Sequence, residues 1–233
     1  MHSPNLNTAL ILFTRTPQEE AAHKKILKNG KAPQQKQLFR LLVQHARLLG
    51  QQTGLPFFVV DSASQQGNTF GERLQNAFAA LYAQGFAKVI AIGNDCVQLK
   101  AEDIQQATHH LQNNKAVFGP ALDGGVYLLG LDQALFRLKT GFSEINWQTA
   151  TVLAELQTWC GSEMLVLPQV YTDLDTSHQV LAAFAAKQLP SAYMALLMQI
   201  FTNWVYRVNP FILRVSTLFA SSYSFRGPPV RIS

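Results

Sequence analysis

Three short polar segments of the sequence carry residue types that could bind a charged ligand. They read GNDCVQL at 93–99, GPALDGGVY at 119–127 and DLDT at 173–176. A diphosphate carries negative charge that a hard cation such as Mg²⁺ or Mn²⁺ neutralises, and such cations prefer carboxylate oxygens. Asp95 and Asp175 could supply those oxygens, which points to a metal–diphosphate site formed by the first and last segments.

Gly124 and Gly125 in the middle segment could contact the same ligand. Without a Cβ, their backbone can lie close to a sugar or phosphate above a sheet. Each segment also has a plain structural interpretation. The glycine pair is typical of a β-turn, Asp95 could brace a turn or cap a helix, and Asp175 with Thr176 could begin a helix. Because all three segments follow predicted strands, we favour a shared binding role.

Several common catalytic signatures are absent from the sequence. It has no GxGxxG after the first predicted strand and no GxxxxGK[ST] loop, which argues against a dehydrogenase or a P-loop NTPase. It also lacks HExxH and GxSxG, so zinc peptidases and serine hydrolases are not supported. His109 and His110 are adjacent on a predicted helix and point in different directions, which indicates surface histidines rather than a metal pair.

The elements that would position these segments are alternating strands and helices. The predicted strands span 9–14, 56–60, 88–92, 116–118, 126–131 and 164–167. The predicted helices span 37–49, 102–112, 149–160 and 177–187, with another that begins at Gly71 and ends at Gly85. This order predicts an α/β fold with a mostly parallel central sheet and helices on both faces. Ligands of such sheets bind outside the carboxyl ends of the strands, which is where Asp95 falls.

Composition favours one large domain with a small anionic ligand. Of the 233 residues, 48% are apolar and 14% charged, which suits a buried sheet and not a disordered chain. The formal charge of +5 fits a phosphorylated small molecule, and the absence of a Lys/Arg block argues against nucleic-acid binding. Cys96 and Cys160 form neither a disulfide framework nor a CxxC pair, which predicts a reducing, cytoplasmic location.

The sequence divides into an α/β domain at 1–189 and an apolar C-terminal helical tail at 190–233. The apolar run at 9–13 is too short for the core of a signal peptide, so we do not expect export. Polar residues interrupt the apolar stretch at 193–219, so we expect no transmembrane segment. The apolar side chains of the tail fit a helical stripe, which predicts packing on the domain or a homodimer contact.

The motifs GNDC, GPALDGGVYLLGL, INWQT at 145–149 and DLDT resemble those of a family of bacterial GT-A-like transferases. Members are often labelled as glycosyltransferases linked to arsenosugar biosynthesis. The wider relatives include the guanylyltransferases that make molybdenum cofactor and coenzyme F420. The resemblance covers roughly residues 8–188 in the family's motif order, and GPALDGG is its most specific piece. It implies a nucleotide-diphospho-sugar transferase fold of the GT-A type.

The resemblance also implies roles for individual residues. Asp95, which follows the third predicted strand, would bind Mg²⁺ or Mn²⁺, and Asp175 would complete the metal site. The GER segment at 71–73 is similar to a GERM-like segment of the family, which implies that Gly71 and Arg73 lie near the nucleotide. The residues implied to line the sugar or acceptor side are Asp123, Gly124, Gly125 and Trp147.

The loop after the first strand follows the family only at its beginning. The family has a pattern like ARxPxxGxxKTRL there, and its glycine and basic pair contact phosphate. TRTP at 14–17 keeps the start of that pattern, which implies that Thr14 and Arg15 bind the nucleotide.

The rest of this loop differs from the family pattern. Glu20 stands where the glycine is expected, and HKKI at 23–26 replaces KTRL. We therefore expect Glu19 and Glu20 to lie against a bound phosphate and to repel it. Lys24 or Lys25 would supply the positive charge that reaches this phosphate.

The resemblance implies a transferase that uses a nucleotide sugar or a nucleoside triphosphate. The metal would bind the diphosphate, and Arg15 with Lys24 or Lys25 would offset the charge that develops in transfer. Asp123 is the candidate base for the acceptor. Attack on the sugar carbon and attack on phosphorus use the same platform, so glycosyl and nucleotidyl transfer both stay open. The altered first loop also fits a non-catalytic binding module on the same fold.

Overall fold

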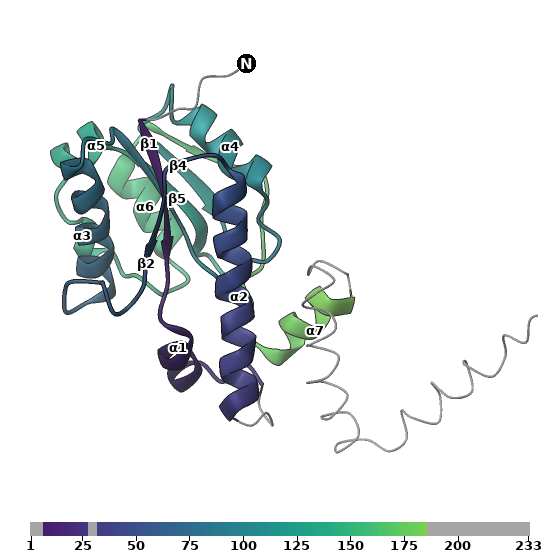
Figure 1. Ribbon diagram of the computed structural model, residues 1–233. Coiled ribbons are helices and arrows are strands. Elements are labelled where there is room, and N and C mark those ends of the chain that lie inside the picture. The colour runs from purple at the N-terminus through teal and green to yellow at the C-terminus, as the bar shows by residue number, and fades with distance from the viewer. Residues whose placement is uncertain (1–6, 28–31, 186–233) are drawn as a thin grey trace, which may run out of the picture. The chain divides into compact units, whose positions relative to one another are not determined.

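A mixed six-stranded sheet forms the centre of this computed structural model, which describes residues 7–27 and 32–185 (Figure 1). The strands lie in the order β2-β1-β3-β5-β4-β6. β5 is antiparallel to both of its neighbours, and the other pairs are parallel. The strands are β1 (Thr8–Phe13), β2 (Phe57–Val60), β3 (Lys88–Ile92), β4 (Ala116–Pro120), β5 (Val126–Asp132) and β6 (Met164–Val166).

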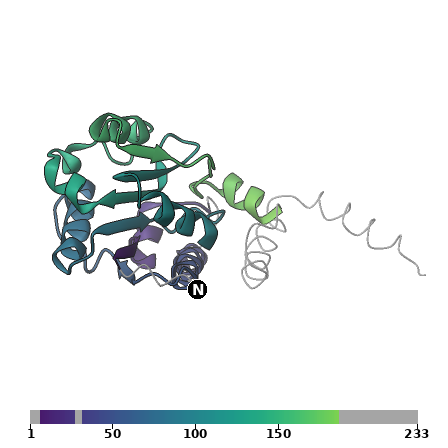
Figure 2. The same ribbon diagram turned by 90° about the horizontal axis from the view of Figure 1, so that it is seen from above.

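Helices cover both faces of this sheet, as the sequence predicted (Figures 1 and 2). The helices are α1 (Pro17–His23), α2 (Ala32–Gln52), α3 (Phe70–Ala83), α4 (Ala101–His110), α5 (Gln133–Leu138), α6 (Val152–Cys160) and α7 (Ser177–Ala185), with a 3₁₀ turn, η1, at Phe142–Glu144. α3 and α6 pack on one face, and α2 and α4 pack on the other.

Two apolar clusters, one on each face, explain the continuous apolar run of β1. Ala9 and Ile11 point into the cluster beneath α3 and α6, whereas Leu10 and Leu12 point into the cluster beneath α2 and α4. A strand buried on both faces needs apolar residues at every position instead of at alternate ones. The run at the start of the chain is therefore a central strand, as predicted.

Local signals set the ends of α3. Thr69 accepts a hydrogen bond from the backbone N–H of Glu72, and the Glu72 carboxylate accepts one from the Thr69 N–H, which completes a capping box. Beyond the helix, Gly85 has a φ of +97°, a conformation that costs other residues free energy. The helix begins one residue before the predicted start at Gly71, and it ends at Ala83 with its C-cap at Gln84, so Gly85 follows the cap.

The sequence analysis missed two short helices and the direction of one strand. α1 has its N-cap at Thr16 and proline at its first position, but its seven residues are too few to show a helical period. α5 has six residues and is missed for the same reason. β5 runs antiparallel because residues 121–125 form a tight turn between β4 and β5.

The carboxyl ends of β1 and β3 meet at one edge of the sheet. Thr14, directly after β1, donates a hydrogen bond through Oγ1 to Oδ1 of Asn94, after β3, at 3.0 Å. The segment that follows β6 returns to this edge, because the backbone N–H of Leu174 donates to the carbonyl of Asp95 at 3.0 Å. Among the described residues, no helix has the length and apolar character needed to cross a membrane. The tail predicted at 190–233 lies outside the described residues.

Candidate functional site

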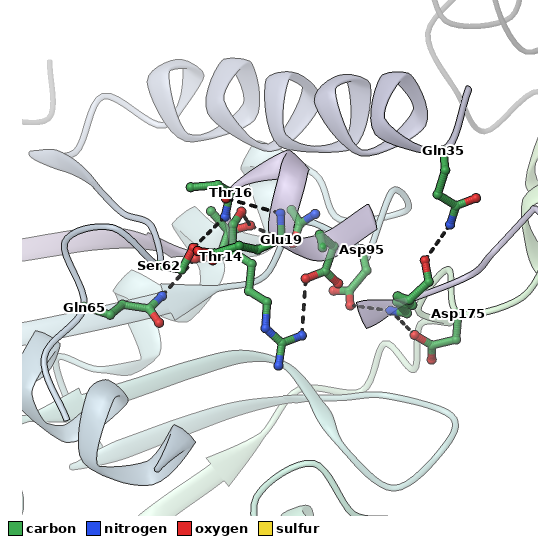
Figure 3. Close-up of polar contacts among 12 residues, drawn as sticks. Thr14, Thr16, Glu19, Gln35, Ser62, Gln65, Asp95 and Asp175 are labelled. Atoms are coloured by element: carbon green, nitrogen blue, oxygen red, sulfur yellow. Dashed lines mark hydrogen bonds and ion pairs between the residues drawn. The ribbon is translucent and has the colours of Figure 1, made fainter. Parts of the chain in front are cut away.

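Three charged side chains from distant parts of the chain meet at the carboxyl edge (Figure 3). The Lys24 ammonium forms ion pairs with both Asp95 and Asp175, and its Nζ lies 3.4 Å from Oδ2 of Asp95. The side chains are partly enclosed, with 23% of Lys24, 34% of Asp95 and 39% of Asp175 exposed. The two predicted metal ligands are therefore brought together as expected, but a lysine ammonium joins them.

Lys24 is held at this position by the end of α1 and by α2. Its backbone N–H donates to the carbonyl of Glu20 at 2.8 Å, which closes the last turn of α1. Its own carbonyl accepts a hydrogen bond from Nε2 of Gln35, a buried residue of α2. Lys25, one residue further on, is exposed. Of the two lysines left open by the sequence, Lys24 is the one that the fold directs toward the carboxylates.

The electrostatics of Lys24 reflect opposing effects. Burial by itself lowers the pKa of a lysine, because it penalises the charged form. Attraction to Asp95 and Asp175 outweighs this penalty, so the pKa of Lys24 is raised above its ordinary value. Lys24 is therefore a permanent cation at neutral pH.

Asp173 is a fourth member of the site, and the sequence analysis did not assign it a role. Burial and the negative charges of Asp95, Asp123 and Asp175 raise the pKa of Asp173 to about 8, against a smaller opposing effect of Lys24. Its Oδ1 is buried and has no hydrogen-bond partner among the residues that the structure describes. The signal was present in the sequence, because Asp173 lies two residues before Asp175 in the same DLDT segment.

Arg15, a predicted phosphate ligand, is paired within the protein. Its Nη1 lies 3.3 Å from Oε2 of Glu20, whose side chain is only 11% exposed. Glu20 thus lies against Arg15 and does not stand free in the loop, whereas Glu19 is exposed. The acidic residue that replaces the expected glycine neutralises the arginine retained by the loop.

Asp123 lies in the turn between β4 and β5. Its Oδ1 accepts a hydrogen bond from the Gly125 N–H at 3.0 Å, and the Gly124 N–H donates to the Ala121 carbonyl at 3.1 Å. Gly124 has a φ of +90°, and a Cβ there would collide with the backbone oxygen of Ala150. The glycine pair therefore has the geometry of the β-turn interpretation. The negative charge of Asp123 acts on the site by raising the pKa of Asp173.

The remaining predicted residues lie in and around α3. Gly71 is buried, and a Cβ on it would collide with the backbone oxygen of Ser143 and the ring of Trp147. Trp147 packs against Phe142 and donates through Nε1 to the Phe142 carbonyl at 3.0 Å. Arg73 donates to the carbonyl of Asn68 at 3.3 Å. These contacts are those of a packed core and a braced loop, and no hydrogen bond between described residues joins Arg73 or Trp147 to the aspartates.

Residues other than the two predicted metal ligands cap the helices that follow them. The N-cap of α4 is Lys100, whose N–H donates to Oδ2 of Asp103, so Asp95 does not cap this helix. α7 is capped by Thr176, whose Oγ1 accepts the N–H of Gln179 at 3.3 Å. The carboxylate of Asp175 instead pairs with Lys24. Neither carboxylate is needed as a helix cap.

The donor set fits a divalent metal only in combination with a ligand. Within residues 7–27 and 32–185, no group of three or more His, Cys, Asp or Glu side chains is arranged to hold a metal ion. Mg²⁺ in proteins commonly uses one or two carboxylates and completes its coordination with substrate phosphates and water. Asp95 and Asp175 match that chemistry, with the buried, unpaired Oδ1 of Asp173 beside them.

The fold defined by this sheet is that of the nucleotide-diphospho-sugar transferases. A crystal structure described as a "putative nucleotide-diphospho-sugar transferase" from Desulfovibrio desulfuricans G20 matches with a TM-score of 0.63 and 23% sequence identity. The match covers 83% of this chain and 94% of that chain. The chain belongs to the family described as "Uncharacterized protein conserved in bacteria (DUF2064)", whose model matches residues 31–149, half of its length.

More distant structures share less of the architecture. Rv0371c from Mycobacterium tuberculosis H37Rv, in complex with manganese, matches with a TM-score of 0.43 and 12% identity over 76% of this chain and 97% of that one. A structure described as a hypothetical transferase from Thermus thermophilus matches with a TM-score of 0.41 and 15% identity over 71% of this chain and 92% of that chain. A comparison with curated proteins found no match.

Proposed function

We propose that the protein is a transferase acting on a nucleotide-diphosphate sugar, with the diphosphate bound beside Lys24, Asp95 and Asp175. The observation that carries this proposal is the convergence of these three side chains at the carboxyl edge of the strands. Neither carboxylate caps a helix, and ligands of open α/β sheets bind at this edge. A charged cluster at the binding edge whose carboxylates cap no helix is typical of a functional site.

The residues at this edge divide the work between charge neutralisation and proton transfer. Mg²⁺ or Mn²⁺ held by Asp95 and Asp175 would neutralise the diphosphate when bound. Arg15 and Lys24 carry the positive charges that would stabilise the leaving diphosphate. Asp123 is exposed and would accept the proton of an attacking hydroxyl, because its carboxylate forms no ion pair with a cation among the described residues.

Nucleotidyl transfer is a second candidate on the same site, because it needs the same diphosphate contacts. A non-catalytic binding module is favoured by a different observation, which is that Arg15 and Lys24 are both already paired with carboxylates of the protein. A site whose cations are internally satisfied could bind a nucleotide without accelerating its transfer. Turnover of nucleotide sugars and nucleoside triphosphates, measured separately, distinguishes these three functions.

The test is calorimetric titration of nucleotide sugars with and without Mn²⁺, on the parent protein and on Asp95→Asn, Asp175→Asn and the double variant. We expect each substitution to weaken metal-dependent binding about tenfold or more, since two ligands of one cation depend on each other. The double variant should lose clearly less than the sum of the two single losses. Binding that responds neither to Mn²⁺ nor to either substitution would exclude the proposed site.

A further inference from the structure

The Lys24 ammonium lies where a metal shared by Asp95 and Asp175 would have to bind. It pairs with one oxygen of each carboxylate, Oδ2 of Asp95 and Oδ1 of Asp175. A divalent metal bonded to the same oxygens at about 2.1 Å would lie within a few ångströms of this ammonium. Two cations so close in a partly enclosed site repel each other strongly, because water screens them poorly there. Metal and ammonium therefore exclude each other.

The surroundings allow the ammonium to move without unfolding the loop. The backbone of Lys24 is anchored through its N–H to Glu20 and through its carbonyl to Gln35. The side chain beyond these anchors has four flexible bonds and is 23% exposed, so Nζ can leave the carboxylates while the backbone stays in place.

The charges at the site favour an exchange of cations over simple loss of one. The negative charges of Asp95, Asp123 and Asp175 all act on Asp173 at this edge, and the Lys24 ammonium opposes their effect. Removal of the ammonium without replacement would leave this negative charge uncompensated. A bound diphosphate would add more, so the state with ligand needs both the metal and the ammonium.

We propose that Lys24 and a divalent metal compete for Asp95 and Asp175, and that metal binding releases the Lys24 ammonium to the phosphate of the ligand. This inference rests on the proposed nucleotide-diphosphate site, and it adds that the metal and the diphosphate depend on each other for binding. Metal alone binds poorly, because it must displace a favourable ion pair. Metal and diphosphate bind cooperatively, because the displaced ammonium gains a new partner.

Titration of Mn²⁺ alone tests the competition without any nucleotide. Lys24→Met keeps an unbranched side chain one atom shorter and removes its charge, and Lys25→Met is the matched control because Lys25 is exposed and carries the same charge. We expect Lys24→Met to bind Mn²⁺ at least tenfold more tightly than Lys25→Met, which should stay close to the parent. Equal Mn²⁺ affinity of the two variants would overturn the competition.

A second titration, with inorganic diphosphate in saturating Mn²⁺, tests the release of Lys24. The parent should bind diphosphate at least tenfold more tightly than Lys24→Met, although that variant holds the metal better. Equal diphosphate affinity would overturn the release step. If diphosphate binds neither the parent nor any variant while the Mn²⁺ competition is still observed, the result would instead count against the proposed function. Thermal unfolding shows whether each variant is folded, and Lys24→Gln replaces Lys24→Met if the latter is not.

Discussion

At the residue scale, the site is decided by which charges find partners inside the protein. Arg15 and Lys24 are both neutralised by carboxylates, and Asp173 is left with a buried oxygen that has no hydrogen-bond partner within the described part of the chain. Such an oxygen costs folding free energy, because a polar atom loses water without gaining an equivalent contact. Residues kept at a cost to stability are more readily explained by ligand binding than by folding.

The raised pKa of Asp173 predicts a pH-dependent loss of stability. An aspartate has a pKa of about 3.9 in the unfolded chain, and the folded protein raises that of Asp173 to about 8. Between these two pH values the folded state holds a proton that the unfolded state has lost. The contribution of Asp173 to stability is therefore fully present below about pH 4 and is lost as the pH rises toward 8. Asp173→Asn should remove this fall, so the variant should melt at a higher temperature than the parent at pH 8.5.

Thermal unfolding of both proteins between pH 5 and pH 8.5, in buffer with a chelator, measures this effect. The difference between the two melting temperatures should grow with pH in favour of Asp173→Asn. Parallel curves for the two proteins would show that Asp173 does not carry the proton.

Glu20 predicts a gain of binding on substitution. Because its carboxylate neutralises Arg15 in a largely buried pair, Glu20→Gln should free the guanidinium and tighten nucleotide binding several-fold. Glutamine is preferable to glycine here, since glycine within α1 would weaken the helix by about 1 kcal/mol. The control is Glu19→Gln, which removes the same charge from an exposed neighbour. Isothermal titration should separate the two, and equal gains in both variants would mean that only net charge matters.

At the scale of the elements, short helices and caps place the charged groups. α1 ends at His23 and directs Lys24 toward the strand edge, although the sequence showed only a loop there. Thr176 and Gln179 cap α7 reciprocally, which holds the preceding Asp175 at the same edge. The positions of Lys24 and Asp175 at this edge thus depend on two helix ends.

Substitution by alanine should affect stability at Gly71 and ligand binding at Gly93. Gly71→Ala places a methyl group against the backbone of Ser143 and the ring of Trp147, so it should cost about 1–3 kcal/mol of stability. Gly93→Ala meets chiefly the Asp95 carboxylate, 2.8 Å away, which can turn aside. It should cost little stability and weaken metal-dependent ligand binding. Denaturant unfolding and calorimetry of both variants measure this, and an unchanged stability of Gly71→Ala would contradict the packing role.

At the scale of the whole molecule, the sheet lies between two apolar clusters, one on each face. Cys160 lies in the cluster with α3 and α6, and Cys96 lies in the cluster with α2 and α4. Each central strand contributes side chains to both, so neither cluster can separate from the sheet without exposing the other. The described domain should therefore unfold as one unit.

The two buried thiols predict how this unfolding can be followed. Burial raises the pKa of both thiols, to about 12 for Cys160, so neither forms a reactive thiolate in the folded protein. Single-cysteine variants, Cys96→Ala and Cys160→Ala, should react with a thiol reagent over the same range of urea concentration. Their curves should coincide with the loss of helical circular dichroism. Labelling of one thiol well before the other would show that the two faces unfold separately.

The sequence by itself determined the alternation of strands and helices, the apolar strand that precedes Asp95, and the pairing of Asp95 with Asp175 as candidates for one site. Those features depend on apolar periodicity and turn residues, which act over a few neighbouring positions. Only the tertiary structure decided that β5 is antiparallel, that Lys24 and not Lys25 meets the carboxylates, and that Asp173 is buried among them. Lys24 and Asp95 are 71 residues apart in the sequence, so their contact depends on the spatial order of the strands in the sheet. No local pattern in the chain encodes that order, because it results from burying both faces of one sheet at once.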